Sequence, residues 1–113
     1  MTASEAIFKA KLLQKKFGII GKVAGNYLLA GFNVKVIGRD YLSFIAIRGG
    51  ERYGVLVVEN IKDVVAKAEK LVNVAKKLNL IPVLVIYGRQ GLLPPDVYEK
   101  IRELGVKVKY FRP

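Results

Sequence analysis

An almost uninterrupted apolar run, IPVLVIY at residues 81–87, constrains the fold of this chain more than any other feature. A strand with one exposed face alternates apolar and polar residues, whereas this run has no charged or amide side chain. Such runs are typical of strands covered by helices on both faces, as in sheets that contain parallel strands. The run therefore predicts a central strand in the sheet of an α/β protein.

Helical patterns lie on both sides of this strand. Residues 61–78 repeat apolar positions every three or four residues, with Asp63 near the expected positive end and Lys76 and Lys77 near the negative end. After the strand, Pro94-Pro95 can open a short helix that Gly105 ends. We predict a helix in each of these segments.

The N-terminal residues 4–29 are also predicted to be helical, with Ser4 as the N-cap. Gly18, Gly21 and Gly25 weaken the interior of this helix, because glycine is a poor helix former. They indicate a bend or a close packing contact, and leave open a helix in one piece or two.

The remaining segments have the two-residue period of strands. Phe32 to Val36 alternates and stops at Gly38; residues 41–47 and 52–59 follow, joined by the tight turn Gly49-Gly50. These three strands predict an antiparallel meander. The tail 106–111 places Lys107 and Lys109 on one face, which suits a strand near the sheet edge. One domain covers residues 1–113.

The charge balance points to a polyanionic partner. Lysine and arginine number 20 against 9 acidic residues, a net charge of +11. Such an excess attracts nucleic acid through the summed field of the protein. The alternative is a lysine-rich surface that keeps a heat-adapted, thermostable protein soluble, but such proteins are enriched in glutamate as well.

Several chemistries are excluded, because the chain has no cysteine and no histidine. It can form no disulfide, thiolate nucleophile, serine-histidine pair or imidazole-ligated metal site. Carboxylates, lysine, tyrosine and metal-bound water remain. The sequence also lacks an apolar stretch of about 20 residues and a signal-peptide pattern, so we expect a cytoplasmic protein without a membrane partner.

The segments GKVAGNYLLAGFNV and DYLSFIAIRGGERYGVLVVEN resemble the first helix and strand, and the hairpin of the second and third strands, of the restriction-endonuclease-like nuclease superfamily. Small archaeal Holliday-junction-resolvase-type and RecB-like nucleases belong to it. The resemblance covers nearly the whole chain. It implies an α/β fold of order αβββαβαβ, with a mixed sheet flanked by helices, and often a dimer.

In that family an acid on the second strand and an acid-x-lysine pair on the third hold Mg²⁺, with a helical glutamate assisting. The resemblance places the second-strand acid at Ser43, the third-strand pair at Val57 and Glu59, and the helical glutamate near Gly21. A cation that prefers oxygen ligands would then find at most one carboxylate. This register implies a nuclease fold without hydrolysis and without a bound metal.

A shift of one step in this register gives the alternative of an active Mg²⁺-dependent endonuclease. Glu59 would then hold the acid position, Asp40 would supply a second carboxylate, and Lys62 or Arg39 would replace the lysine. Asp40 has a plainer interpretation as a turn residue that hydrogen-bonds its own backbone.

Predicted contacts with nucleic acid are mostly arginines in or beside turns, where guanidinium groups can clamp phosphates without reading bases. The predicted set comprises Lys15, Lys22, Arg39, Arg48, Arg52, Lys62 and Arg89. Tyr41 and Tyr53 can stack on unpaired bases, or can complete the core instead.

Three functions are therefore open. The first is a catalytically inactive nuclease-fold protein that binds DNA or RNA as a structural or targeting subunit, in a homodimer or beside an active nuclease subunit. The second is the active Mg²⁺-dependent endonuclease. The third is a protein-interaction module whose charge is incidental.

Overall fold

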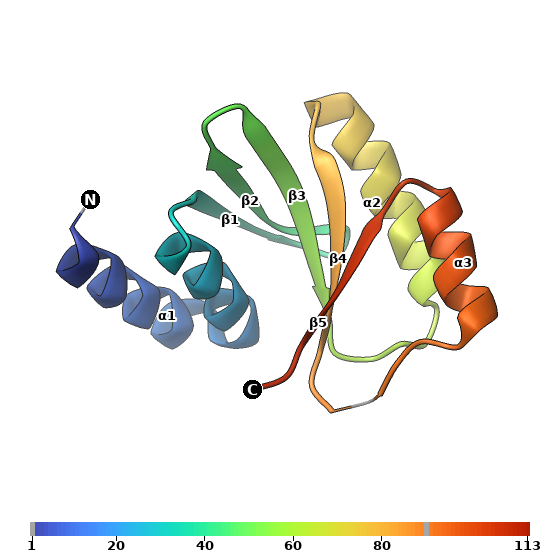
Figure 1. The fold of residues 1–113 in the computed structure, drawn as a ribbon, viewed down its shortest axis with the longest axis horizontal. Helices are drawn as coiled ribbons and strands as arrows, with labels where there is room; N and C mark the ends of the chain where they lie inside the picture. Colours follow the sequence, from blue (N-terminus) through green and yellow to red (C-terminus); the bar gives the residue numbers. More distant parts are fainter. Residues whose placement is uncertain (1, 90) are drawn as a thin grey trace.

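The protein is a mixed β-sheet with helices on both faces (Figure 1). The computed structural model describes residues 2–89 and 91–113. Over these residues the strands are β1 (Asn33–Arg39), β2 (Leu42–Arg48), β3 (Glu51–Val58), β4 (Ile81–Tyr87) and β5 (Lys107–Phe111). The helices are α1 (Ala3–Leu29), α2 (Val64–Leu78) and α3 (Pro95–Glu103).

The strands lie in the order β1-β2-β3-β4-β5 across the sheet. β1, β2 and β3 form the predicted antiparallel meander, whereas β3, β4 and β5 are parallel to one another. The apolar run predicted to lie inside the sheet is β4, between β3 and β5, and the lysine-containing tail is the edge strand β5. The α/β class and the order of elements are thus confirmed.

Each face of the sheet has its own apolar core. On one face, Leu84 of β4 packs with Leu71 of α2 and Ile101 of α3. On the other face, Val23 of α1 packs with Phe44 of β2. Full burial of a side chain of this kind stabilises the fold by about 1.5–3 kcal/mol. The result is a three-layer arrangement with α1 on one side and α2 and α3 on the other.

α1 is folded back on itself at Gly18. The backbone there has φ 59° and ψ −127°, values that glycine adopts readily because it has no Cβ. The two segments of α1 then pack side by side, with Gly25 so close to Ala10 that an added Cβ would lie 3.2 Å from the Ala10 Cβ (Figure 1). The glycines predicted to mark a bend or a close contact thus mark both.

Two helix starts differ from the predictions. The N-cap of α1 is Thr2, whose hydroxyl accepts a hydrogen bond from the Glu5 N–H at 3.2 Å, so the prediction of Ser4 is wrong. α2 starts at Val64, after Asp63 in a left-handed conformation with φ 57°. The apolar period reaches back to Ile61, but the backbone turns before the helix begins.

Candidate nucleic-acid interface

The positions that the nuclease resemblance assigns to metal ligands have structural roles in this chain. Ser43 is 2% exposed, and its hydroxyl accepts a hydrogen bond from the Val57 N–H at 2.9 Å. The backbone pairing of β2 with β3 ends at Phe44 and Val55. Beyond this pair, the Ser43 hydroxyl takes the place of a backbone carbonyl as the acceptor for the Val57 N–H. Gly21 is buried where the two segments of α1 touch, since a Cβ there would collide with the Leu13 carbonyl.

Replacing Ser43 with alanine is expected to lower the free energy of unfolding by about 1–3 kcal/mol, because the Val57 N–H would lose its partner. Urea denaturation followed by circular dichroism measures this loss. The exposed Ser4, in the first turn of α1, is the matched control, and its alanine variant should change stability by less than about 0.5 kcal/mol. Equal stability of the two variants would contradict the structural role of Ser43.

The two carboxylates of the alternative metal site are both exposed. Asp40 lies in the turn between β1 and β2, and Glu59 directly follows β3. Within residues 2–89 and 91–113, no three acidic side chains come together in a group that could hold a metal ion. Lys62, the proposed lysine substitute, lies in the turn before α2, where its N–H donates to the Asn60 side chain at 2.8 Å.

The predicted phosphate contacts are distributed over the molecule. Arg39, Lys62 and Arg89 lie at the end of the sheet where β1, β3 and β4 end, whereas Arg48 and Arg52 lie at the opposite end. Lys15 and Lys22 are on the two segments of α1, the first exposed and the second half-buried.

Two of these arginines join the β2–β3 hairpin to the ends of helices. Arg48 donates from Nη1 to the Ala30 carbonyl at 3.0 Å, and its guanidinium lies 4.3 Å from the centre of the Phe32 ring. Arg52 donates to the Leu78 carbonyl at the end of α2, at 3.4 Å. These guanidinium groups satisfy carbonyls that the helices leave unpaired.

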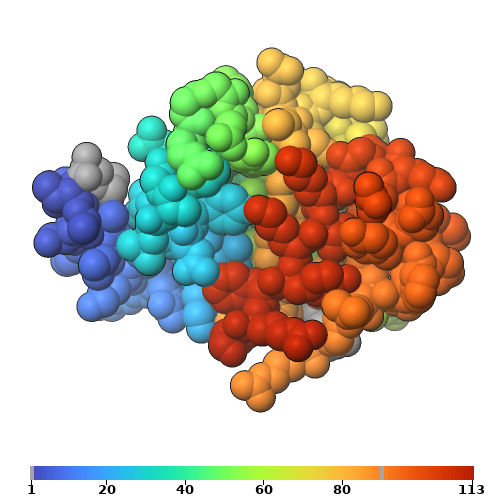
Figure 2. All heavy atoms as spheres, in the orientation of Figure 1, coloured from blue at the N-terminus to red at the C-terminus, as the bar shows by residue number. Residues whose placement is uncertain are grey.

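A basic surface whose lysines are not among the predicted phosphate contacts lies on β5. Lys107 pairs with Val83 and Lys109 with Val85 in the register of β5 with β4, so both lysines lie on the face that packs against α1. α1 contacts β1 and β2 and leaves the β5 side of this face without a covering helix (Figure 1). Figure 2 shows β5 at the surface, beside the end of α1 and the β2–β3 hairpin.

Aromatic rings accompany the two lysines. The Tyr87 and Phe111 rings stack with centroids 5.5 Å apart and an interplanar angle of 13°. We call Lys107, Lys109, Tyr87 and Phe111 the β5 surface. Cations beside half-buried rings on an uncovered sheet face are the combination that binds the backbone and the bases of nucleic acid.

A cavity of about 280 Å³ opens between β5, the end of α1 and the β2–β3 hairpin. We call it the β5 cavity. The aromatic residues of its lining are Tyr27, Phe32 and Tyr53, and the charged ones are Arg48, Glu51, Lys107 and Lys109. The Lys107 amino group lies 5.6 Å from the centre of the Tyr53 ring, and that of Lys109 lies 5.7 Å from the centre of the Tyr27 ring.

Glu51 is held by two partners in this cavity. The Tyr53 hydroxyl donates to its carboxylate at 2.7 Å, and the Arg48 Nη2 lies 3.4 Å from it. The hydrogen bond from Tyr53 lowers the pKa of Glu51, and the Arg48 charge acts in the same direction. The same hydrogen bond raises the pKa of Tyr53, so the pair is a phenol beside a carboxylate.

The Tyr27 hydroxyl is buried and has no hydrogen-bond partner within the described part of the chain. Burial raises the pKa of this phenol, and the neighbouring Tyr53 raises it further. The group is therefore a neutral donor at physiological pH. Its ring packs edge-on against Phe32 and Phe44, with centroids 5.3 Å away in each case.

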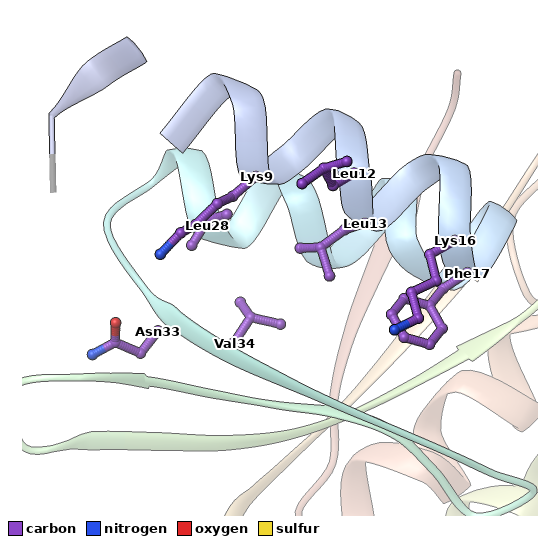
Figure 3. A pocket seen from close by; sticks show the side chains of 8 residues that line it. All are labelled: Lys9, Leu12, Leu13, Lys16, Phe17, Leu28, Asn33 and Val34. Atoms are coloured by element: carbon purple, nitrogen blue, oxygen red, sulfur yellow. The ribbon is translucent and has the colours of Figure 1, made fainter. Parts of the chain in front are cut away.

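A second cavity, of about 350 Å³, lies between the first segment of α1 and β1 (Figure 3). Leu12, Leu13 and Phe17 line it from the helix together with Lys9 and Lys16. The same segment exposes large apolar side chains, which are Ile7 at 48%, Phe8 at 63%, Leu12 at 48% and Phe17 at 38%. Exposed large apolar side chains favour contact with another protein where they lie together on the surface.

Comparison of the chain with protein-family models, with curated proteins and with solved structures gave no match. The family resemblance therefore rests on the sequence segments and on the order of strands and helices. Over the described residues, none of the helices combines the length and the apolar character that crossing a bilayer requires.

Proposed function

We propose that this chain binds nucleic acid through the β5 surface and does not cut it. The observation that carries the proposal is the pair Lys107 and Lys109 on the uncovered half of the sheet, beside stacked aromatic rings. The net charge of +11 attracts a polyanion to the molecule, and these lysines give its backbone a place to bind.

The proposal includes a restriction-endonuclease-like fold that has lost its metal site. The antiparallel meander followed by two parallel strands, with helices on both faces, supports this family. The buried Ser43 hydroxyl and the close-packed Gly21 support the loss, because both residues serve the fold where the family has acids. Such a protein acts as a structural or targeting subunit, and an active nuclease subunit beside it would supply any cleavage.

Binding is tested by titrating labelled single-stranded, duplex and branched oligonucleotides at increasing salt. If about five phosphates of a duplex are neutralised, the logarithm of the affinity should fall with the logarithm of the salt concentration at a slope near −4.5. Affinity without salt dependence, or no binding at low salt, would contradict the proposal.

Cleavage is tested with the same substrates in Mg²⁺ or Mn²⁺. We expect intact substrates from the wild-type chain. The variants Asp40→Ala and Glu59→Ala identify the alternative, and Glu69→Ala, an exposed acid on α2, is the matched control. Metal-dependent cutting that is lost in the first two variants and kept in the third would establish the active endonuclease instead.

A second candidate, a protein-interaction module, is favoured by the apolar side chains on the first segment of α1. Phe8 is 63% exposed although it is among the most hydrophobic residues of the chain. The partner in this case is a second copy of the chain or an active nuclease subunit. This candidate predicts a homodimer in solution that Phe8→Glu converts to a monomer. Such a result, together with no binding of oligonucleotides, would favour the protein-interaction module over the nucleic-acid-binding protein.

A further inference from the structure

The β5 cavity has an excess of positive charge that its own residues do not neutralise. Arg48, Lys107 and Lys109 face one carboxylate, Glu51, which is already bound by the Tyr53 hydroxyl and by Arg48. Neither lysine forms an ion pair with any residue that the structure describes. The two amino groups are therefore available to an anion that enters the cavity.

Tyr27 adds a neutral donor to these charges. Its hydroxyl is shielded from solvent and unpaired over residues 2–89 and 91–113, although buried polar groups almost always have a partner. An acceptor oxygen of a ligand would satisfy it once the side chains around the hydroxyl move to admit that oxygen. The site therefore favours an anion with several oxygens, because one oxygen cannot meet two ammonium groups and a phenol at once.

The size and the rings of the cavity select among such anions. Its volume of about 280 Å³ lies just below the range of about 300–1,000 Å³ usual for larger organic ligands. Tyr27 is packed edge-on against Phe32 and Phe44, and Lys109 lies over its ring. A base would have to displace that lysine to stack there, whereas a phosphate group would meet the lysine directly.

We propose that the β5 cavity binds a phosphate monoester, with Lys107, Lys109 and the Tyr27 hydroxyl donating to its oxygens. A monoester carries about −1.5 to −2 charges at neutral pH, more than the single charge of a phosphodiester in a strand. This inference rests on the proposed function, since it names the group of the nucleic acid that one end of the β5 surface recognises. The monoester is the phosphorylated end of a strand or a free mononucleotide.

The test compares one oligonucleotide with a phosphate at its 5′ end, at its 3′ end, or at neither end. We expect the wild-type chain to bind a phosphorylated form at least about 10-fold more tightly than the hydroxyl form, the effect of one charge-assisted hydrogen bond. In Tyr27→Phe, which keeps the ring and its edge-on contacts, the ratio of the two affinities should fall toward 1. Because only the ratio counts, a general loss of affinity does not affect the result.

The phosphate monoester can belong to a strand end or to a free mononucleotide. Competition of a nucleoside monophosphate with the oligonucleotide, with the nucleoside as control, distinguishes these two ligands. Competition that is weaker in Tyr27→Phe than in the wild-type chain assigns the free mononucleotide as a ligand, and a preference seen only in strands assigns the strand end. The variant Lys109→Gln should reduce the same ratio, which provides a second measurement that keeps the Tyr27 hydroxyl and its edge-on contacts with Phe32 and Phe44.

Two results would overturn the inference and leave the proposed function in place. The first is equal affinity for phosphorylated and hydroxyl ends in a chain that still binds with the expected salt dependence. The second is a preference for phosphorylated ends that is as large in Tyr27→Phe as in the wild-type chain. If no oligonucleotide binds, the proposed function fails instead. Titration of the chain with the nucleoside monophosphate then tests whether the β5 cavity binds a phosphate monoester. Binding that is lost in Tyr27→Phe supports this inference, and no binding overturns it.

Discussion

Replacing Lys107 and Lys109 together with glutamate is expected to lower the affinity for an oligonucleotide about 100-fold. The variant loses two phosphate contacts and adds two repulsive charges, and a 100-fold loss corresponds to about 2.8 kcal/mol in total. The salt slope should also become shallower by about 2, because two fewer counterions are released. Fluorescence anisotropy at several salt concentrations measures both quantities.

The matched control reverses the same number of charges on the other side of the sheet. Lys70 and Lys77 are exposed on α2, so the variant Lys70→Glu/Lys77→Glu has the same net charge as the test variant. We expect it to lose less than about 10-fold, through the weaker overall field alone. Equal losses in the two variants would show that binding follows net charge and not the β5 surface.

A folding control is needed, because a glutamate at position 107 would approach Glu51 across the β5 cavity. Circular dichroism and thermal unfolding of the variant should resemble those of the wild-type chain, since both lysine side chains are exposed and form no ion pair within the described residues. Loss of binding in a folded variant assigns the effect to the surface.

The class and the order of elements could be predicted because they depend on local patterns. The apolar run of β4 and the helical period of α2 each report which faces of one segment are buried. The turn Gly49-Gly50 then fixes the hairpin of β2 and β3. Each of these features depends on a few consecutive residues, so it can be predicted without knowledge of the tertiary structure.

The β5 surface could be predicted only in part. The alternation of the tail shows that Lys107 and Lys109 share a face, and the structure agrees. Which face they occupy depends on the register with β4, and whether that face is open depends on α1 covering only β1 and β2 among its main contacts. The strand register and the position of α1 are properties of the tertiary structure, and no short sequence pattern predicts them.

Of the residues that line the β5 cavity, the sequence indicated Tyr53 as a stacking candidate, Arg48 as a phosphate contact, and Lys107 and Lys109 as neighbours on one strand face, but not the cavity itself. Its lining comes from the end of α1, the β2–β3 hairpin, β4 and β5, which are separated by up to most of the chain length. Tyr27 carries no signal in the sequence, because a tyrosine at a helical period is ordinarily a core residue with its hydroxyl at the rim. Its unpaired hydroxyl is visible only once the neighbours are in place.

The largest expected effect on stability comes from Gly21→Ala. The added Cβ would collide with the backbone carbonyl of Leu13, and a backbone atom cannot move aside as the end of a flexible side chain can. Forcing a methyl group into such a contact costs about 1–3 kcal/mol, and here the upper end applies, so the two segments of α1 must separate. A loss of about 3 kcal/mol would lower the Tm by about 10 °C or more.

Gly50→Ala is the matched control, because Gly50 lies in an open turn with no heavy atom near the added Cβ and without a positive φ. Its Tm should stay the same or rise slightly, since alanine restricts the unfolded chain. A Gly21→Ala variant as stable as Gly50→Ala would mean that the two segments of α1 do not pack closely. A glutamate could then also fit at position 21, and the structural reason for the absence of the acid that the nuclease resemblance places there would no longer hold.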